Sequence, residues 1–124
     1  MRIIYSTEKI KKICEDIKIA TTYFGGNKML AISLMSRINS LKQADNIKDI
    51  INQPQMSFHK LLNKGKNKNL EGYFAIDVKT RKDKWRIIIE LLDDDKNPFV
   101  PCNIDVIANY VKVVEVKEVS NHYE

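Results

Sequence analysis

The chain has 124 residues, 44% of them hydrophobic, which suits one domain with a modest core and excludes a disordered tail. No apolar run approaches the roughly 20 residues of a membrane span, and the N-terminus has too short an apolar run for a signal peptide. The net charge is +5, but residues 60–86 alone carry nine Lys or Arg against three Asp or Glu, whereas residues 87–124 carry three against eight.

The first half of the chain predicts one strand followed by helices. Residues 2–6 (RIIYS) predict the strand, and a helix follows from about residue 8 until Gly25-Gly26 ends it. The apolar stripe of this helix consists of Ile10, Ile13, Cys14, Ile17 and Phe24.

A second helix is predicted after Asn27, which can cap it. Its buried face consists of Leu30, Leu34, Ile38 and Leu41. The Gly-Gly link between the two helices indicates an antiparallel helical hairpin. Ile47, Ile50 and Ile51 allow one or two further helical turns before Pro54.

After Pro54 the apolar residues alternate with polar ones, a period of two residues that is typical of β-strands. Residues 56–63 (MSFHKLLN) and 72–78 (GYFAIDV) predict two strands, and a basic turn, KTRKDK, precedes a central strand at 85–93. Residues 93–109 form an acidic loop with room for a helical turn, and residues 110–119 form the last strand. The order predicts an α+β fold, with an N-terminal strand and a helical hairpin on an antiparallel or mixed sheet of about four to five strands. The other face of the sheet is expected to be open to a ligand.

The basic middle segment indicates a polyanionic partner, and an ordinary solvated surface is the alternative. His59 lies at the start of the basic segment, and His122 lies near the chain end. A lone histidine is more often structural than catalytic. Arg86 interrupts an apolar strand. It either pairs with Asp77 or Glu90 across the sheet, or faces an open cleft and binds a phosphate with both guanidinium arms.

These residue types suit RNA cleavage without a metal. Such a reaction needs a base for the ribose 2′-OH, an acid for the leaving 5′ oxygen, and cations for the charged transition state. DNA lacks the 2′-OH, so this chemistry selects RNA. The nucleotide-binding and hydrolase glycine motifs are absent, and Cys14 and Cys102 lack zinc-site spacing, so we expect no cofactor or metal and a reducing cytoplasm.

An ordered set of motifs resembles the HigB-type toxins of the RelE/ParE superfamily. The set is FHKLLNKG, EGYFAI, KWRIII and the C-terminal VVEVKEVSNHYE, covering roughly residues 56–92 and 110–124. The resemblance implies the toxin of a bacterial type II toxin-antitoxin system, an endoribonuclease (mRNA interferase) that cuts mRNA on the ribosome and so inhibits translation.

The resemblance also implies roles for individual residues. His122 transfers a proton, Tyr123 stacks on or orients a base, and His59 is the second acid-base candidate. Lys64 and Arg86 stabilise the phosphate. The RNA-binding candidates are Lys60, Lys66, Lys68, Arg81, Lys82 and Lys84.

The expected partners are mRNA, the ribosome and a cognate antitoxin, a helix-turn-helix protein of the HigA kind, in a toxin-antitoxin hetero-oligomer without membrane association. Two other functions are consistent with the same sequence. A ParE-like gyrase inhibitor keeps the fold and needs no acid-base pair. A non-catalytic RNA-binding module predicts salt-sensitive binding without cleavage.

Overall fold

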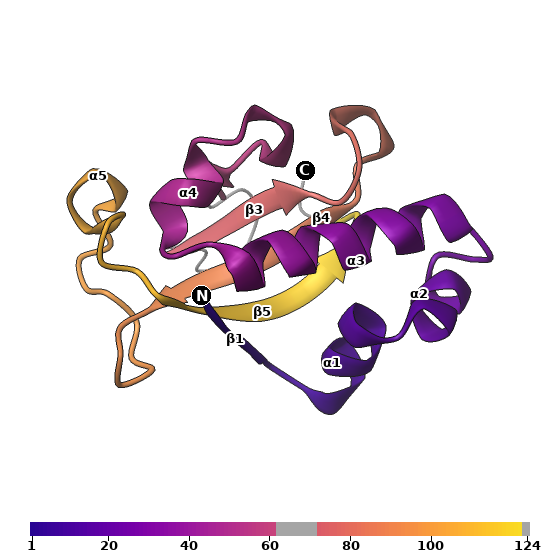
Figure 1. Ribbon diagram of the computed structural model, residues 1–124, viewed down its shortest axis with the longest axis horizontal. Coiled ribbons are helices and arrows are strands. Elements are labelled where there is room, and N and C mark those ends of the chain that lie inside the picture. Colours follow the sequence, from indigo (N-terminus) through magenta and orange to yellow (C-terminus); the bar gives the residue numbers. More distant parts are fainter. Residues whose placement is uncertain (62–71, 123–124) are drawn as a thin grey trace.

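A mixed β-sheet organises the computed structural model, which describes residues 1–61 and 72–122 (Figure 1). Within those residues five strands pair in the order β1-β5-β4-β3-β2. The strands are β1 (Arg2–Tyr5), β2 (His59–Lys60), β3 (Tyr73–Asp77), β4 (Arg86–Leu92) and β5 (Val113–Ser120). β1 runs parallel to β5 and the other pairs are antiparallel, which confirms the predicted α+β class with its mixed sheet.

The central position of β4 follows from its sequence. Its residues are apolar on both faces apart from Arg86 and Glu90, and only a strand with neighbours on both sides buries such a run. The predicted strand at 56–63 is much shorter than expected. Its first residue, Met56, ends the 3-10 turn η1 (Pro54–Met56), and β2 contains only His59 and Lys60 of the described residues.

Helices cover one face of the sheet. α1 (Glu8–Glu15), α2 (Ile17–Tyr23) and α3 (Lys28–Gln43) follow β1, and Figure 1 shows α3 crossing in front of the sheet. The Asn27 side chain accepts a hydrogen bond from the Leu30 N–H at 3.1 Å, as the predicted cap requires.

Two shorter helices complete the described part of the chain. α4 (Ile47–Ile51) precedes Pro54 as predicted, and α5 (Ile104–Ile107) is the helical turn expected in the connection between β4 and β5. Among the described residues, no helix combines the length and the apolar content that a membrane crossing requires.

The prediction of one continuous helix between the first strand and Gly25 is wrong. Asp16 has an extended backbone, with φ −127° and ψ 114°, and it ends α1. Its carboxylate then accepts hydrogen bonds from the N–H groups of Lys18 and Ile19, at 2.9 and 3.2 Å, and so caps α2. Ile17 consequently leaves the predicted stripe and is 40% exposed.

The core lies between the helices and the sheet. Its helical side contains the four predicted residues of α3, and its sheet side contains alternate residues of β3, β4 and β5. The main side chains are Ile13, Leu30, Leu34, Ile38, Leu41, Phe74, Ile76, Ile87, Ile89, Val114 and Val116. Cys14 is buried among them, as its place on the α1 stripe predicts.

The expectation that the opposite face of the sheet is open is wrong at its centre. Residues that alternate with the core positions point to this face, and they include Ala75, Ile88, Asp77 and Arg86. All four are buried, and Leu61 packs against Ala75 and Ile88 in a second, small apolar cluster. The centre of this face, as far as the described residues show it, is therefore closed.

Candidate functional site

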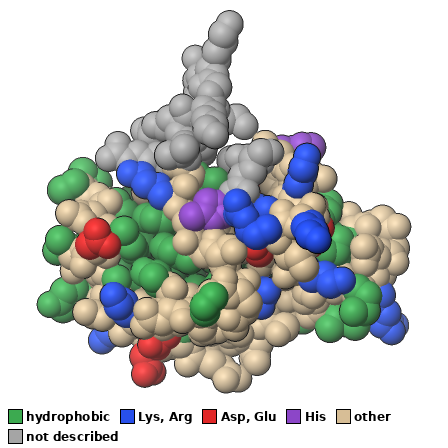
Figure 2. Space-filling view, turned by 90° about the horizontal axis from the view of Figure 1, so that it is seen from above, with side chains coloured by type: hydrophobic (Ala, Val, Ile, Leu, Met, Phe, Trp, Pro, Cys, Tyr) green, Lys and Arg blue, Asp and Glu red, His purple; other side chains and the backbone are tan. Residues whose placement is uncertain are grey.

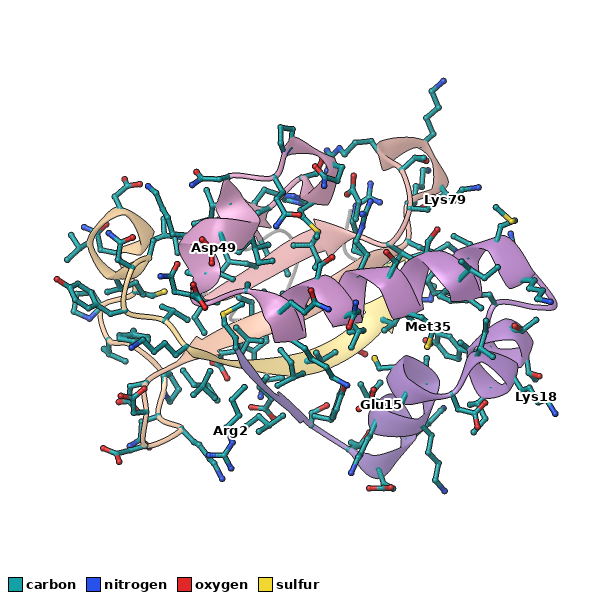
Figure 3. All side chains as sticks on the ribbon, viewed as in Figure 1. Arg2, Glu15, Lys18, Met35, Asp49 and Lys79 are labelled. Atoms are coloured by element: carbon teal, nitrogen blue, oxygen red, sulfur yellow. The ribbon has the colours of Figure 1, made fainter. Side chains whose placement is uncertain are left out.

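The turn between β3 and β4, residues 78–85, concentrates positive charge at one end of the sheet. Its four basic side chains are exposed, and they are Lys79, Arg81, Lys82 and Lys84. We call residues 78–85 the basic turn. Lys79 is labelled in Figure 3, where the turn follows β3 at the edge of the molecule.

Asp83, the single acidic residue of the basic turn, accepts hydrogen bonds from other residues of the same turn. Thr80 donates to Asp83 Oδ2 through its backbone N–H at 3.1 Å and its hydroxyl at 3.2 Å, and the Trp85 N–H donates to Asp83 Oδ1 at 2.9 Å. The bond from the Thr80 N–H is half of a capping box around the short helix η2 (Arg81–Asp83), and the other half is the Thr80 side chain accepting from the Asp83 backbone N–H. Asp83 therefore fixes the backbone, and the four cations around it point to solvent.

Arg86 holds the basic turn from the first residue of β4. Its Nη1 donates to the carbonyl oxygens of Thr80 and Trp85, at 3.3 and 2.8 Å, and its Nη2 donates to that of Arg81 at 3.0 Å. A guanidinium presents several donors in one plane, so one side chain can order several backbone carbonyls at once.

Arg37 of α3 holds the start of the same turn. Its Nε donates to the Asp77 carbonyl at 3.0 Å, and its Nη2 donates to the carbonyls of Lys79 and Gln55, both at 3.2 Å. Two arginines from distant parts of the chain thus fix the backbone on which the exposed cations stand.

The prediction that Arg86 faces an open cleft is wrong. Its side chain is 3% exposed, and its Nε lies 3.2 Å from Asp77 Oδ1. That contact is an ion pair whose geometry does not make a hydrogen bond, so Asp77 Oδ1 has no hydrogen-bond partner among the described residues. The alternative pairing with Asp77 is confirmed, while Glu90 pairs with Lys117 at 3.3 Å.

His122 lies at the same end of the sheet as the basic turn. Ser120, the last residue of β5, is in register with Arg86, the first residue of β4. The His122 backbone N–H donates to the Ser120 Oγ at 3.1 Å, and the residue is exposed. His122 therefore lies two residues beyond the end of β5, at the end of the sheet where the basic turn leads into β4.

His59 stands on the opposite flank, on edge strand β2, where it pairs with Ala75 of β3. Its Nδ1 lies 2.5 Å from the Ser57 carbonyl oxygen. A carbonyl only accepts, so Nδ1 is the donor in this contact. β4 and β3 separate β5 from β2, which places the two strands about 14 Å apart. The histidines thus flank the Arg86–Asp77 pair and do not lie side by side.

Figure 2 shows histidine side chains next to Lys and Arg side chains on one face of the molecule. Of the predicted RNA-binding residues, Lys60, Arg81, Lys82 and Lys84 are exposed. Arg81 remains 59% exposed although its Nη1 lies 3.7 Å from Asp77 Oδ1. Such a surface attracts phosphates, and an imidazole at its rim can transfer a proton at neutral pH.

Several predicted site residues lie outside the described part of the chain. They are Lys64, Lys66, Lys68 and Tyr123.

Sequence reasoning missed Lys79 and Arg37. Lys79 opens the KTRKDK stretch, so its position in a basic turn was the available signal. Arg37 had no such signal, because it lies in the middle of a helix and contacts the turn only through the tertiary fold.

Among the described residues, no group of three His, Cys, Asp or Glu side chains is arranged to hold a metal ion. The chain matches no family model, and no curated protein and no solved structure is significantly similar to it.

Proposed function

We propose that the chain is the toxin of a type II toxin-antitoxin system and acts as a ribosome-dependent mRNA endonuclease that needs no metal. One observation carries the proposal: an exposed histidine, His122, lies at the same end of the sheet as a turn that presents four exposed cations. The motif resemblance to HigB-type toxins, described above, supports the same activity.

The proposed reaction is attack of a ribose 2′-OH on the adjacent phosphate. A base removes the 2′-OH proton, the 2′ oxygen bonds to phosphorus, and the 5′ oxygen leaves with a proton from an acid. The products are a 2′,3′-cyclic phosphate and a free 5′-OH. His122 transfers a proton in this scheme, and His59 is the second acid-base candidate.

The exposed cations bind and neutralise phosphates in the same scheme. Lys79, Arg81, Lys82 and Lys84 provide the charge of the basic turn, and Lys60 adds to it from β2. From the resemblance, Lys64 stabilises the reacting phosphate, Lys66 and Lys68 hold RNA, and Tyr123 stacks on a base. Arg86 acts through the turn, because its guanidinium is bonded to the turn's carbonyls.

A free nuclease of this kind arrests the cell that makes it. We therefore propose an antitoxin partner, a helix-turn-helix protein of the HigA kind, that forms a hetero-oligomer with the chain in the cytoplasm.

Induced expression in a bacterium, with primer extension on several abundant messages, tests the proposal. The expected result is growth arrest with new 5′ ends that appear only on translated messages. An initiation inhibitor should remove these ends if cleavage depends on the ribosome. Arrest with intact messages would transfer the assignment to a ParE-like action on gyrase.

A non-catalytic RNA-binding module is the second candidate. The separation of His59 and His122 by two strands favours it, because a single imidazole at the basic turn provides only one of the two proton transfers. Soluble protein that binds RNA without arrest and without new 5′ ends would establish this function instead.

A further inference from the structure

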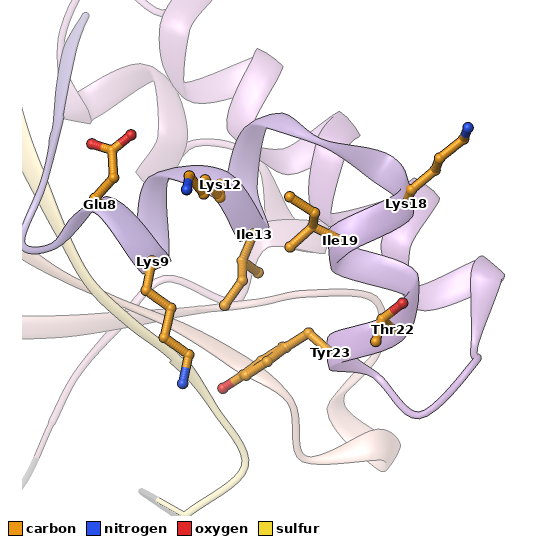
Figure 4. Close-up of a pocket in the computed structure, with 8 residues that line it drawn as sticks. All are labelled: Glu8, Lys9, Lys12, Ile13, Lys18, Ile19, Thr22 and Tyr23. Atoms are coloured by element: carbon orange, nitrogen blue, oxygen red, sulfur yellow. The ribbon is translucent and has the colours of Figure 1, made fainter.

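A groove between α1 and α2 lies outside the basic turn. It has a volume of about 610 Å³, and its apolar floor is formed by Ile13, Ile19 and Tyr23. Figure 4 shows these three side chains on the side where the two helices face each other, with Lys9 extending beside them. We call this feature the α1–α2 groove.

The floor of the groove leaves large apolar side chains in water. Ile19 is 39% exposed and Tyr23 is 37% exposed, and both stand on one face of α2 because they are four residues apart. Adjacent exposed apolar side chains with a polar rim mark interaction sites more often than ordinary surface.

The rim of the groove is mainly basic. Lys9 and Lys12 stand one turn apart on α1, Lys18 stands at the start of α2, and Glu8 is the single acid among the lining residues. None of the three lysines forms an ion pair with a described residue. The rim therefore complements a partner with acidic groups.

We propose that the α1–α2 groove docks an acidic amphipathic helix of a partner protein. Helix-in-groove recognition needs an apolar floor for the anchors of the helix and complementary charge along the sides, and the groove has both. A second copy of this chain fits poorly, because it would bring another lysine rim and another net charge of +5. RNA fits less well, because its phosphates would pair only with the lysine rim and would leave the isoleucines of the floor uncovered.

Tyr23 connects the groove to the end of β5. Its hydroxyl donates to the Val119 carbonyl at 2.6 Å, and its ring meets the Trp85 ring edge-on at 5.8 Å. Val119 precedes Ser120, whose hydroxyl oxygen accepts from the His122 N–H. A partner helix that packs on Tyr23 would therefore change the surroundings of Val119, at the end of β5, and of Trp85, the last residue of the basic turn.

Trp85 is the single tryptophan of the chain, which makes the groove testable by fluorescence. The probe is a synthetic tryptophan-free helical peptide with leucine on one face and glutamate on the other. Titration into the full chain should change the Trp85 emission saturably. A matched peptide with lysine in place of glutamate should not bind.

Variants locate the site. Lys9→Glu combined with Lys12→Glu should weaken peptide binding about tenfold, because two attractions become repulsions. Ile19→Asp should weaken it further by placing a charge on the floor. Ile32→Asp is the matched control, because Ile32 is 44% exposed on α3 and does not line the groove.

Amide spectra test the connection through Tyr23. Peptide binding should shift the Val119 and His122 amide signals in the native chain. In Tyr23→Phe, which retains the ring and loses the hydroxyl, the peptide should still bind and the Val119 and His122 shifts should shrink. Undiminished shifts would overturn the connection.

Three results would overturn the docking proposal itself. The first is equal binding of the acidic and basic peptides. The second is peptide binding that the lysine and Ile19 variants leave unchanged. The third is a short single-stranded RNA that competes with the peptide and loses as much affinity as the peptide does in the lysine variants. A fourth such result is a dimer in sedimentation that Ile19→Asp dissociates, because a second copy would then occupy the groove. None of these readouts measures RNA cleavage, so the docking proposal and the proposed nuclease fail separately.

Discussion

The Nε atom of Arg86 on β4 lies 3.2 Å from the Oδ1 atom of Asp77 on β3, and both side chains are almost fully buried. The two residues are also in register, so the ion pair fixes how the central strands meet. Because the same guanidinium binds three carbonyls of the basic turn, the arrangement of the exposed cations depends on a buried charge.

Arg86→Ala should therefore destabilise the fold strongly. Removing one member of a buried ion pair leaves the other charge uncompensated, which costs about 3–5 kcal/mol. Urea unfolding of the purified chain measures this loss. Arg81→Ala is the matched control, since Arg81 approaches the same carboxylate but is 59% exposed, and its loss should stay below about 1 kcal/mol. A similar midpoint for both variants would contradict the structural role of Arg86.

The role of Arg86 shows where sequence reasoning stops. The apolar run around it predicts a central strand, and an arginine there requires a partner. The choice between Asp77, Glu90 and an external phosphate depends on strand register and on what covers the face. The spacing of residues along the chain determines neither the strand register nor the cover of the face. The sequence is therefore consistent with all three partners, and the fold selects Asp77.

His122→Ala should remove toxicity and leave the stability of the chain nearly unchanged. The side chain is exposed, and the bond to the Ser120 hydroxyl uses the backbone N–H, which alanine retains. Growth after induction, together with the urea midpoint, measures both effects. His59→Ala should act on cleavage more weakly, because β2 lies on the far flank of the sheet. Toxicity at the native level in His122→Ala would end its assignment to proton transfer.

The exposed cations of the basic turn should govern the salt dependence of RNA binding. Replacing Arg81, Lys82 and Lys84 by alanine removes up to three phosphate contacts, and each contact contributes roughly 0.7 to the slope of log K against log salt on a single strand. The slope should therefore fall by about 2 while the fold remains intact. The matched control replaces Lys11, Lys48 and Lys112, which are also exposed. An equal fall in the control would mean that net charge alone attracts the RNA.

The helical half of the fold was more predictable than the site. Apolar spacing and the Asn27 cap located α3, because both signals lie within one helix. The end of α1 at Asp16 was not predicted, because an aspartate within a helical pattern is equally consistent with a solvated helix residue and with a cap. Arg37 was missed for a different reason, since its three carbonyl partners are distant in sequence.

The two cysteines should differ sharply in reactivity. Cys14 is buried beside Glu15, and burial raises the pKa of its thiol to about 12, so little of the reactive thiolate exists at neutral pH. Cys102 is only partly buried. Iodoacetamide should modify Cys102 of the folded chain first, and Cys14 only in urea, as peptide mass spectrometry can establish. Modification of Cys14 at the rate of Cys102 would mean that α1 opens readily.

Stability should fall at alkaline pH, because the folded chain keeps protons that the unfolded chain releases. Burial raises the pKa of the Cys14 thiol from 9.0 to about 12, and burial beside Glu15 also raises the pKa of Tyr5. The stabilisation from a raised pKa is complete below the unfolded value and is lost as the pH rises toward the folded value. Cys14 should thus contribute a decline of about 1.4 kcal/mol per pH unit above pH 9. Cys14→Ala should make the decline between pH 9 and 10.5 shallower, and Cys102→Ala should not. Urea midpoints across this range measure both slopes, and equal slopes in the native chain and Cys14→Ala would show that the thiol ionises as readily in the folded state as in the unfolded state.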